Sequence, residues 1–187
     1  MFRIRAKRDP QAFAQLYDRY VDAIYRFVFL KLPSKEAAED VTSETFLRSW
    51  QYVQSYPHVS NFRALLYRIA RNLVADTYRK AESSGERVTF SLSQTSSLIE
   101  EGEDLSDRER GRSVVEARAE VALILQDISR LKEDFQDVLT LRLIDGLSFG
   151  DIGQILEKST GNARVMYHRA LQALDSIKGK GQNHEHP

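Results

Sequence analysis

The sequence contains no cysteine, and only four prolines and one tryptophan occur among its 187 residues. The absence of cysteine excludes disulfide bonds and thiolate metal sites. No apolar run approaches the ~18 residues that a membrane-spanning helix needs. The basic start, Met1 to Arg8, lacks the apolar stretch of a signal peptide. We therefore expect a protein of the cytoplasm, without membrane insertion.

The motifs of common catalytic sites are also missing. The sequence has no glycine-rich phosphate loop and no nucleophile elbow. His184 and His186 lie two residues apart in a polar tail, which is a weak metal-binding pattern. The four carboxylates between Glu36 and Glu44 fall in one predicted helix that contains no histidine. We expect a protein that is not an enzyme and binds no metal or cofactor.

The net charge of zero conceals an asymmetry along the chain. Residues 1–80 carry 14 Lys/Arg and 8 Asp/Glu, whereas residues 81–120 carry 5 and 10. Residues 121–187 are nearly balanced, with 8 and 9. Binding responds to the local field, so a neutral total does not exclude a polyanionic partner such as DNA.

Three amphipathic helices are expected in residues 1–80. Apolar residues recur at helical spacing from Phe13 to Val28, from Val41 to Val53 and from Phe62 to Leu73. Ser34 fits the N-cap of the second helix, and a loop at Ser55–Ser60 precedes the third. This pattern predicts a compact helical domain.

A second helical domain is expected after a linker. Residues 81–112 are rich in serine, include an acidic run at Glu100–Asp104 and show no period, so we predict a flexible linker there. Residues 113–178 open with a capping box and contain a predicted helix from Glu133 to Ile144, with Asp145-Gly146 as its C-cap. Residues 179–187 are expected to form a disordered tail.

A helix-turn-helix pattern follows Gly146. Ser148 fits an N-cap, Ile152, Ile155 and Leu156 make one apolar face, and Ala163 begins the apolar face of a second helix. Polar side chains then lie on the exposed side of that second helix, where they suit phosphates and base edges in a DNA major groove. They are Ser159, Thr160, Asn162, Arg164, His168 and Arg169. The alternative is a helical hairpin with a solvated face.

A basic helix with interleaved aromatic residues starts at Asn61. Arginines neutralise phosphates and rings stack on bases, so this mixture suits single-stranded or opened DNA. The candidates on the helix and in its preceding loop are Tyr56, His58, Ser60, Asn61, Arg63, Tyr67, Arg68, Arg71 and Asn72. The alternative is a solvated basic face whose tyrosines are half-buried. Asp76 is expected to be a structural carboxylate paired with a neighbour.

Aromatic residues on the second helix leave two interpretations open. Phe46, Leu47 and Trp50 fit either the core or a surface that docks a protein partner. They cannot all face the core together with Val41 and Val53. We therefore expect part of this helix to be interfacial.

These segments together resemble the bacterial sigma factors of the extracytoplasmic-function (ECF) group. Residues 13–80 resemble sigma domain 2, in which Asp40–Trp50 (DVTSETFLRSW) is similar to the segment that binds the clamp helices of RNA polymerase. Phe62–Asp76 resembles the segment that reads the −10 promoter element, and Leu131–Leu174 resembles domain 4, which reads the −35 element. The resemblance implies an all-α fold of two small helical domains.

The resemblance also implies partners and site residues. The partners are core RNA polymerase, promoter DNA and an anti-sigma factor. The polymerase contacts would come from Asp40, Ser43, Glu44, Phe46, Leu47, Arg48 and Trp50. A free-standing helix-turn-helix regulator and a helical adaptor remain the alternatives.

Three departures from the family pattern stand out. Ser43 replaces the usual Gln, Glu157-Lys158 replaces the usual Gly-Ile in the turn, and Met166 stands where Arg is common. A glutamate at a turn position that favours glycine predicts left-handed backbone strain at Glu157.

Overall fold

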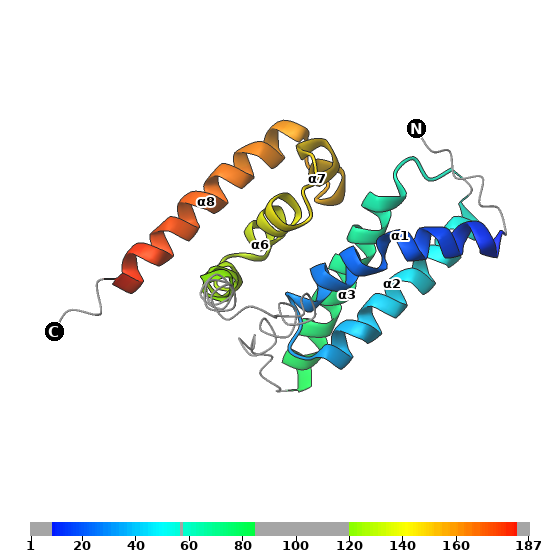
Figure 1. The fold of residues 1–187 in the computed structure, drawn as a ribbon, viewed down its shortest axis with the longest axis horizontal. Helices are drawn as coiled ribbons and strands as arrows, with labels where there is room; N and C mark the ends of the chain where they lie inside the picture. Colours follow the sequence, from blue (N-terminus) through cyan, green and yellow to red (C-terminus); the bar gives the residue numbers. More distant parts are fainter. Residues whose placement is uncertain (1–8, 57, 85–119, 183–187) are drawn as a thin grey trace, which may run out of the picture.

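The computed structural model describes residues 9–56, 58–84 and 120–182, and within these ranges the regular structure is entirely helical (Figure 1). Two groups of helices lie on either side of residues 85–119, as the all-α, two-domain prediction requires. Most of the predicted linker, the capping box at Ser113 and the last five residues lie outside the described ranges. No helix in the described part has the length and apolar character to cross a membrane.

The N-terminal domain consists of α1 (Pro10–Phe29), α2 (Lys35–Ser55) and α3 (Phe62–Ser84). Side chains cap the first two helices: Asp9 accepts from Gln11 N at 2.9 Å and Ser34 accepts from Ala37 N at 3.1 Å. These bonds satisfy backbone donors that have no partner within a helix. The predicted Ser34 cap is therefore confirmed.

Apolar stripes of the three helices meet in one core. Phe27 of α1 and Tyr67 of α3 are buried with ring centroids 5.2 Å apart, edge to face. Leu66 of α3 and Val53 of α2 are also buried. Within each helix the buried apolar residues recur at three- and four-residue spacing, as Ile24, Phe27 and Val28 do in α1, which is why the sequence alone predicted the three helices.

The C-terminal domain contains a helix at residues 120–129, α6 (Glu133–Leu139), the π-helical turn η1 (Thr140–Ile144), α7 (Phe149–Ile155) and α8 (Thr160–Gln182). Gly146 has φ +65°, so the glycine C-cap predicted at Asp145-Gly146 is confirmed. Ser148 caps α7 by accepting from Asp151 N at 3.2 Å. The structure adds the π turn to the predicted helix from Glu133 to Ile144.

Two helices run past the boundaries expected from sequence. α3 continues to Ser84 rather than ending at Lys80, and α8 continues to Gln182 rather than Lys178. Ala81 and Glu82 are good helix formers, and Gly85 is the first strong stop signal after them. In α8, isolated glycines at 179 and 181 each cost only about 1 kcal/mol, which the preceding helix tolerates.

The turn between α7 and α8 is unusually tight. A Cβ atom on Gly153 would lie 2.7 Å from the carbonyl oxygen of Lys158, closer than real contacts allow. Glu157, four residues later, has φ +56°. The left-handed conformation expected at Glu157 is therefore confirmed, and for a side chain other than glycine it carries strain.

Candidate nucleic-acid interface

The first turns of α8 form an open polar surface. Ser159 caps the helix by accepting from Asn162 N at 3.1 Å, which fixes the start of α8 after the turn. Arg164 lies over the ring of Phe149, with its guanidinium carbon 5.6 Å from the centroid. All six predicted −35 side chains are exposed: Ser159, Thr160, Asn162, Arg164, His168 and Arg169. A helix presented in this way fits a major groove.

Eight of the nine predicted −10 residues fall into two sets. The loop side chains Tyr56, His58 and Ser60 are exposed, as is Asn72 on α3. The other set faces the C-terminal domain and consists of Asn61, Arg63, Arg68 and Arg71. Asn61 caps α3 by accepting from Ala64 N at 3.0 Å, and its amide nitrogen lies 2.7 Å from Oε1 of Gln154 in α7.

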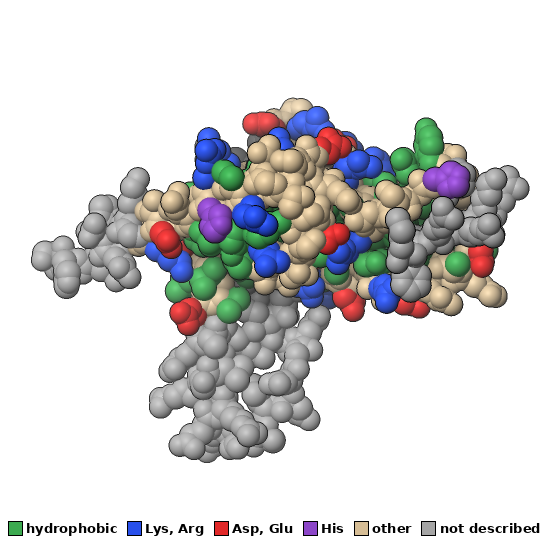
Figure 2. All heavy atoms as spheres, turned by 90° about the horizontal axis from the view of Figure 1, so that it is seen from above, with side chains coloured by type: hydrophobic (Ala, Val, Ile, Leu, Met, Phe, Trp, Pro, Cys, Tyr) green, Lys and Arg blue, Asp and Glu red, His purple; other side chains and the backbone are tan. Residues whose placement is uncertain are grey.

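Three arginines of α3 make ion pairs with carboxylates of the C-terminal domain. Arg63 Nη2 lies 2.6 Å from Asp151 Oδ2, and Arg68 Nη1 lies 3.5 Å from Glu157 Oε1. Arg71 contacts both Asp134 and Asp137 at 2.5 Å. Figure 2 accordingly shows Lys/Arg and Asp/Glu side chains interspersed over one face of the molecule rather than gathered in a basic stripe. We call this set of contacts, together with the buried pairs described next, the seam.

Two carboxylates of the seam are almost fully buried. The side chain of Asp137 is 1% exposed and accepts from Arg71 through Oδ2, while its Oδ1 lies 2.6 Å from Lys31 Nζ. The side chain of Asp145 is 2% exposed and accepts from Arg26 Nη2 at 2.9 Å. Buried charges are tolerated in proteins when they are paired in this way.

Burial and ion pairing shift the pKa values of these ionisable groups in opposite directions. Burial raises the pKa of Asp145, although hydrogen bonds to it oppose the shift. Desolvation would lower the pKa of Arg71, but Asp137 and the neighbouring carboxylates raise it overall. The guanidinium of Arg71 is therefore charged at every physiological pH, and it lies between the carboxylates of Asp134 and Asp137.

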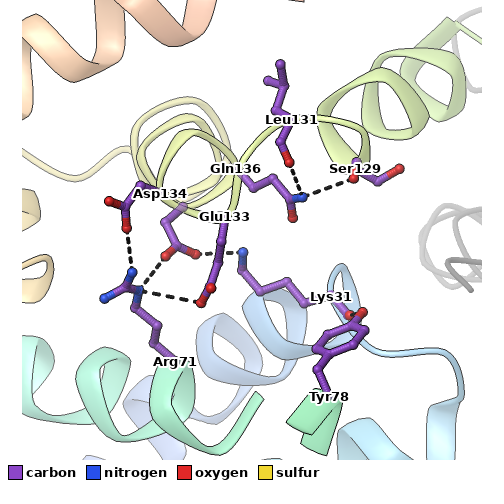
Figure 3. Close-up of polar contacts among 9 residues, drawn as sticks. Lys31, Arg71, Tyr78, Ser129, Leu131, Glu133, Asp134 and Gln136 are labelled. Atoms are coloured by element: carbon purple, nitrogen blue, oxygen red, sulfur yellow. Dashed lines mark hydrogen bonds and ion pairs between the residues drawn. The ribbon is translucent and has the colours of Figure 1, made fainter. Parts of the chain in front are cut away.

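A cleft opens beside the seam, with a volume of about 690 Å³. Arg71, Asn72 and Tyr78 of α3 line one side, and Glu133 and Gln136 of α6 line the other. In Figure 3 the side chain of Gln136 points away from Lys31 toward the backbone of Ser129 and Leu131, to which it donates at 3.0 and 2.8 Å. The cleft is thus lined by charged and polar groups from both domains.

Tyr67 does not lie where sequence analysis placed it. Its side chain is 1% exposed and packs against Phe27 in the core of the N-terminal domain. Burial and the nearby charge of Asp145 raise the pKa of its hydroxyl. Its ring cannot stack on a base in this conformation, so the assignment of Tyr67 to the DNA surface was wrong. Helical spacing placed it beside Arg63 and Arg71, but the core face of α3 is wide enough to include it.

The predicted polymerase surface on α2 also needs a correction. Phe46 is 3% exposed and its ring lies 4.7 Å from that of Tyr17, so Phe46 belongs to the core. Trp50 is half-buried against Phe13, with ring centroids 4.8 Å apart. Leu47 is 51% exposed and is the apolar side chain that this face offers to a partner. Glu44 is half-buried, and the remaining predicted contacts are exposed: Asp40, Ser43 and Arg48.

Several residues of the seam were not singled out from the sequence. Arg26 comes from α1 and Lys31 from the turn that follows this helix, and Asp137 and Asp145 lie on either side of η1. One available signal was that Asp137 lies between helix positions that read as apolar, next to Val138 and two residues from Phe135. A buried carboxylate needs a cationic partner, but the sequence does not show from which helix that partner comes. Asp76 does pair with Arg79, as expected.

The chain matches two family models of known proteins. Residues 16–84 match the Sigma-70 region 2 model and residues 122–174 match the Sigma-70 region 4 model. The ECF RNA polymerase sigma factor SigW of Bacillus subtilis is 33% identical over 181 residues, covering 90% of this chain and 89% of SigW. The chain belongs to the ECF RNA polymerase sigma factors.

One further relative agrees with this assignment, and one solved structure shares the fold. The ECF sigma factor BldN of Streptomyces coelicolor is 33% identical over 167 residues, which cover 89% of this chain but only 60% of BldN. CnrH, solved in complex with the cytosolic domain of CnrY, has the same fold with a TM-score of 0.67 at 22% identity, covering 94% of this chain and 93% of CnrH.

As a sigma factor, the protein directs RNA polymerase core to promoters and does not act as a free-standing regulator. It is not an enzyme, because polymerase carries out the chemistry. Within the described residues, no group of three or more ligating side chains could hold a metal ion. The candidate binding surfaces for polymerase and DNA are the exposed polar faces of α2, α3 and α8.

Proposed function

We propose that the N-terminal domain of this sigma factor binds core polymerase and the −10 element, and that the C-terminal domain binds the −35 element. The observation that carries the proposal is the exposed polar start of α8, on which all six predicted −35 side chains are accessible. The tight turn between α7 and α8 packs against Gly153 and sets the direction of α8 relative to α7, as a helix-turn-helix requires.

The −10 strand would be read by the loop at Tyr56–Ser60 and the start of α3. A protein that reads only double-stranded DNA does not need such a loop beside the helix that enters the groove. A reader of unpaired bases does, because a flipped base needs a ring or an amide edge to replace its lost stacking and pairing. Tyr56 is 59% exposed and stacks on Tyr52 at 4.7 Å, so the loop carries an accessible aromatic surface.

Polymerase would bind the exposed face of α2 around Leu47 and Arg48. The factor would act in the cytoplasm, where bacterial polymerase transcribes. Family resemblance further supports an anti-sigma factor as a partner, since the sigma factor RpoE of Bartonella quintana, which shares this fold, was solved in complex with the anti-sigma factor NepR.

A promoter-transcription experiment with core polymerase tests the proposal. Residues 55–61 are exchanged with those of a related sigma factor, and transcription is measured on promoters with single changes in the −10 or −35 element. We expect preference to change at one or two −10 bases while −35 preference stays fixed. Permanganate mapping of unpaired thymines reports strand opening in the same reactions. Unchanged −10 preference, with no opening by the wild-type protein, would refute the proposed recognition scheme.

A further inference from the structure

Val165 is an apolar side chain in the middle of the predicted −35 surface. It is 49% exposed, and it is the one exposed side chain among the large apolar residues of α8 that the structure describes. Residues three and four positions away share its helix face, and all four are exposed: Gly161, Asn162, His168 and Arg169. Three of these four belong to the predicted −35 set. A DNA duplex that binds these polar side chains therefore also meets Val165.

The packing of α8 requires neither Val165 nor the glycine one turn before it. Valine loses side-chain freedom in a helix, and glycine is a weaker helix former than alanine. A Cβ atom on Gly161 would meet only Ser159 Oγ, at 3.9 Å, so the protein itself leaves room for a side chain there. Helical side chains lean toward the preceding turn, and the absence of one at Gly161 leaves the valine methyl groups uncovered. The two residues thus make a small apolar area that another molecule can approach closely.

The DNA major groove offers one apolar group to such a residue. Base edges there present hydrogen-bond donors and acceptors, and the 5-methyl group of thymine is the exception. The side chain of Val165 can neither donate nor accept a hydrogen bond, so it distinguishes bases only through that methyl group. A cytosine or a purine in the same place would leave the valine against polar atoms, whose burial without a hydrogen bond is unfavourable.

We propose that Val165 is a specificity-determining residue of the −35 surface, and that it selects a thymine by packing against the 5-methyl group of that base. This inference rests on the proposed role of α8 and adds to it a residue outside the six predicted polar contacts. Asn162 and Arg169 lie on the same face as the valine. Their polar contacts hold the helix in the groove, and the valine supplies an apolar contact between them.

A base analogue separates this contact from every hydrogen bond. Deoxyuridine lacks only the methyl group of thymidine and keeps the same donors and acceptors. Each thymine on either strand of the −35 element is replaced singly by deoxyuridine, in a promoter that the full-length factor transcribes in vitro with core polymerase. The substituted and unsubstituted templates compete for limiting holoenzyme in one reaction and give transcripts of different length. The ratio of the two transcripts is then independent of how much of each protein variant is active.

Two substitutions are compared with the wild type. Val165→Ala shortens an exposed side chain, and alanine favours a helix, so the variant keeps its fold. Val121→Ala makes the same change at a valine that is 45% exposed in the helix of residues 120–129, outside α8, and is the matched control.

We expect one −35 thymine, or two neighbouring ones, at which loss of the methyl group lowers the transcript ratio about fourfold for wild type and Val121→Ala, as for one buried methyl group. For Val165→Ala the ratio at the same position should return to about one, because the methyl group has lost its partner.

The outcomes separate this inference from the proposed function. Deoxyuridine effects of equal size in Val165→Ala and wild type, no effect at any −35 thymine, or a −35 element without thymine on either strand would each overturn the role of Val165. Arg164→Ala, tested on the same promoter, then shows how far the failure extends. Impaired transcription at limiting −35 strength means that α8 reads the element and that only the assignment of Val165 is wrong. Normal transcription means that the proposed role of α8 fails as well.

Discussion

Glu44 and Arg48 form an ion pair across one turn of α2, with Arg48 Nε 2.6 Å from Glu44 Oε1. Arg48 is exposed and Glu44 is half-buried, and the two flank Leu47 on the proposed polymerase surface. We predict that Arg48→Glu lowers affinity for core polymerase at least about tenfold, or ~1.4 kcal/mol. The reversed charge repels Glu44 and alters the rim of the interface. Binding is measured by titrating labelled sigma factor with core enzyme.

Lys35→Glu is the matched control for this prediction. Lys35 pairs with Glu39 over the same four-residue spacing on α2, at 4.0 Å, outside the proposed surface. Exposed pairs of this kind contribute only ~0.3–0.5 kcal/mol, so neither variant should unfold the domain. Equal affinities of the two variants for core enzyme, at matched melting temperatures, would remove Arg48 from the interface.

The start of α8 offers a second prediction. Arg164→Ala should lower transcription from promoters that depend on the −35 element, because a base-reading arginine is worth ~1–3 kcal/mol and its loss relaxes specificity. Lys178→Ala removes one exposed positive charge near the other end of the same helix and serves as control. Transcription at limiting −35 strength is the measurement. Normal activity of Arg164→Ala there would show that Arg164 is not a contact.

The strained turn allows a prediction about stability. Glu157 has φ +56°, a conformation that costs a non-glycine residue ~1–2 kcal/mol. We expect Glu157→Gly to be about 1 kcal/mol more stable than Glu157→Ala in urea denaturation, because both variants lose the pair with Arg68 and only glycine relieves the strain. Equal stability of the two would mean that the turn relaxes without cost.

Asp151 should make stability depend on pH. Burial alone would raise the pKa of this carboxyl, but hydrogen bonds from Ser148 and Arg63 and the charge of Arg63 hold the pKa below its ordinary 3.8. The ionised carboxylate of Asp151 therefore stabilises the fold above about pH 4, and this contribution is lost as the pH falls through the lowered pKa.

We predict that Asp151→Asn costs more unfolding free energy at about pH 6.5 than at about pH 3.5. Urea titrations of both proteins at the two pH values measure the difference. The control is Asp175→Asn, whose effect should be small at both values. A cost of Asp151→Asn that stays constant over this range would contradict the assigned role of the ionised carboxylate.

Local chemistry explains why much of this fold could be predicted from the sequence. Ser34, Ser148 and Gly146 act through bonds or dihedral angles within a few residues of themselves, so their roles are visible in short segments. Glu157 belongs to the same class, because its strain depends on the local turn alone.

Residues that depend on distant partners were harder to place. Tyr67 was assigned to a surface because its helical phase was compatible with one. Phe46 fitted either the core or an interface, and only the family resemblance placed it among the polymerase contacts. The core faces are wide enough to include both residues. The seam joins residues more than 60 positions apart, such as Arg71 and Asp137, across a segment for which the sequence predicted only a flexible tether. Charge balance shows that such pairs are possible but not which of them form.

The π-helical turn η1 sets the phase between the two buried carboxylates of the seam, Asp137 and Asp145. Asp137 and Asp145 are eight residues apart, a spacing that would put them about 80° out of phase in an unbroken α-helix. Each π-type hydrogen bond spans five residues rather than four, so the turn absorbs one extra residue. The two side chains thereby keep about the phase of a seven-residue spacing, some 20° short of two full turns. Deleting one residue within Thr140–Ile144 should leave both carboxylates on one face, whereas inserting one there would rotate Asp145 away from Arg26.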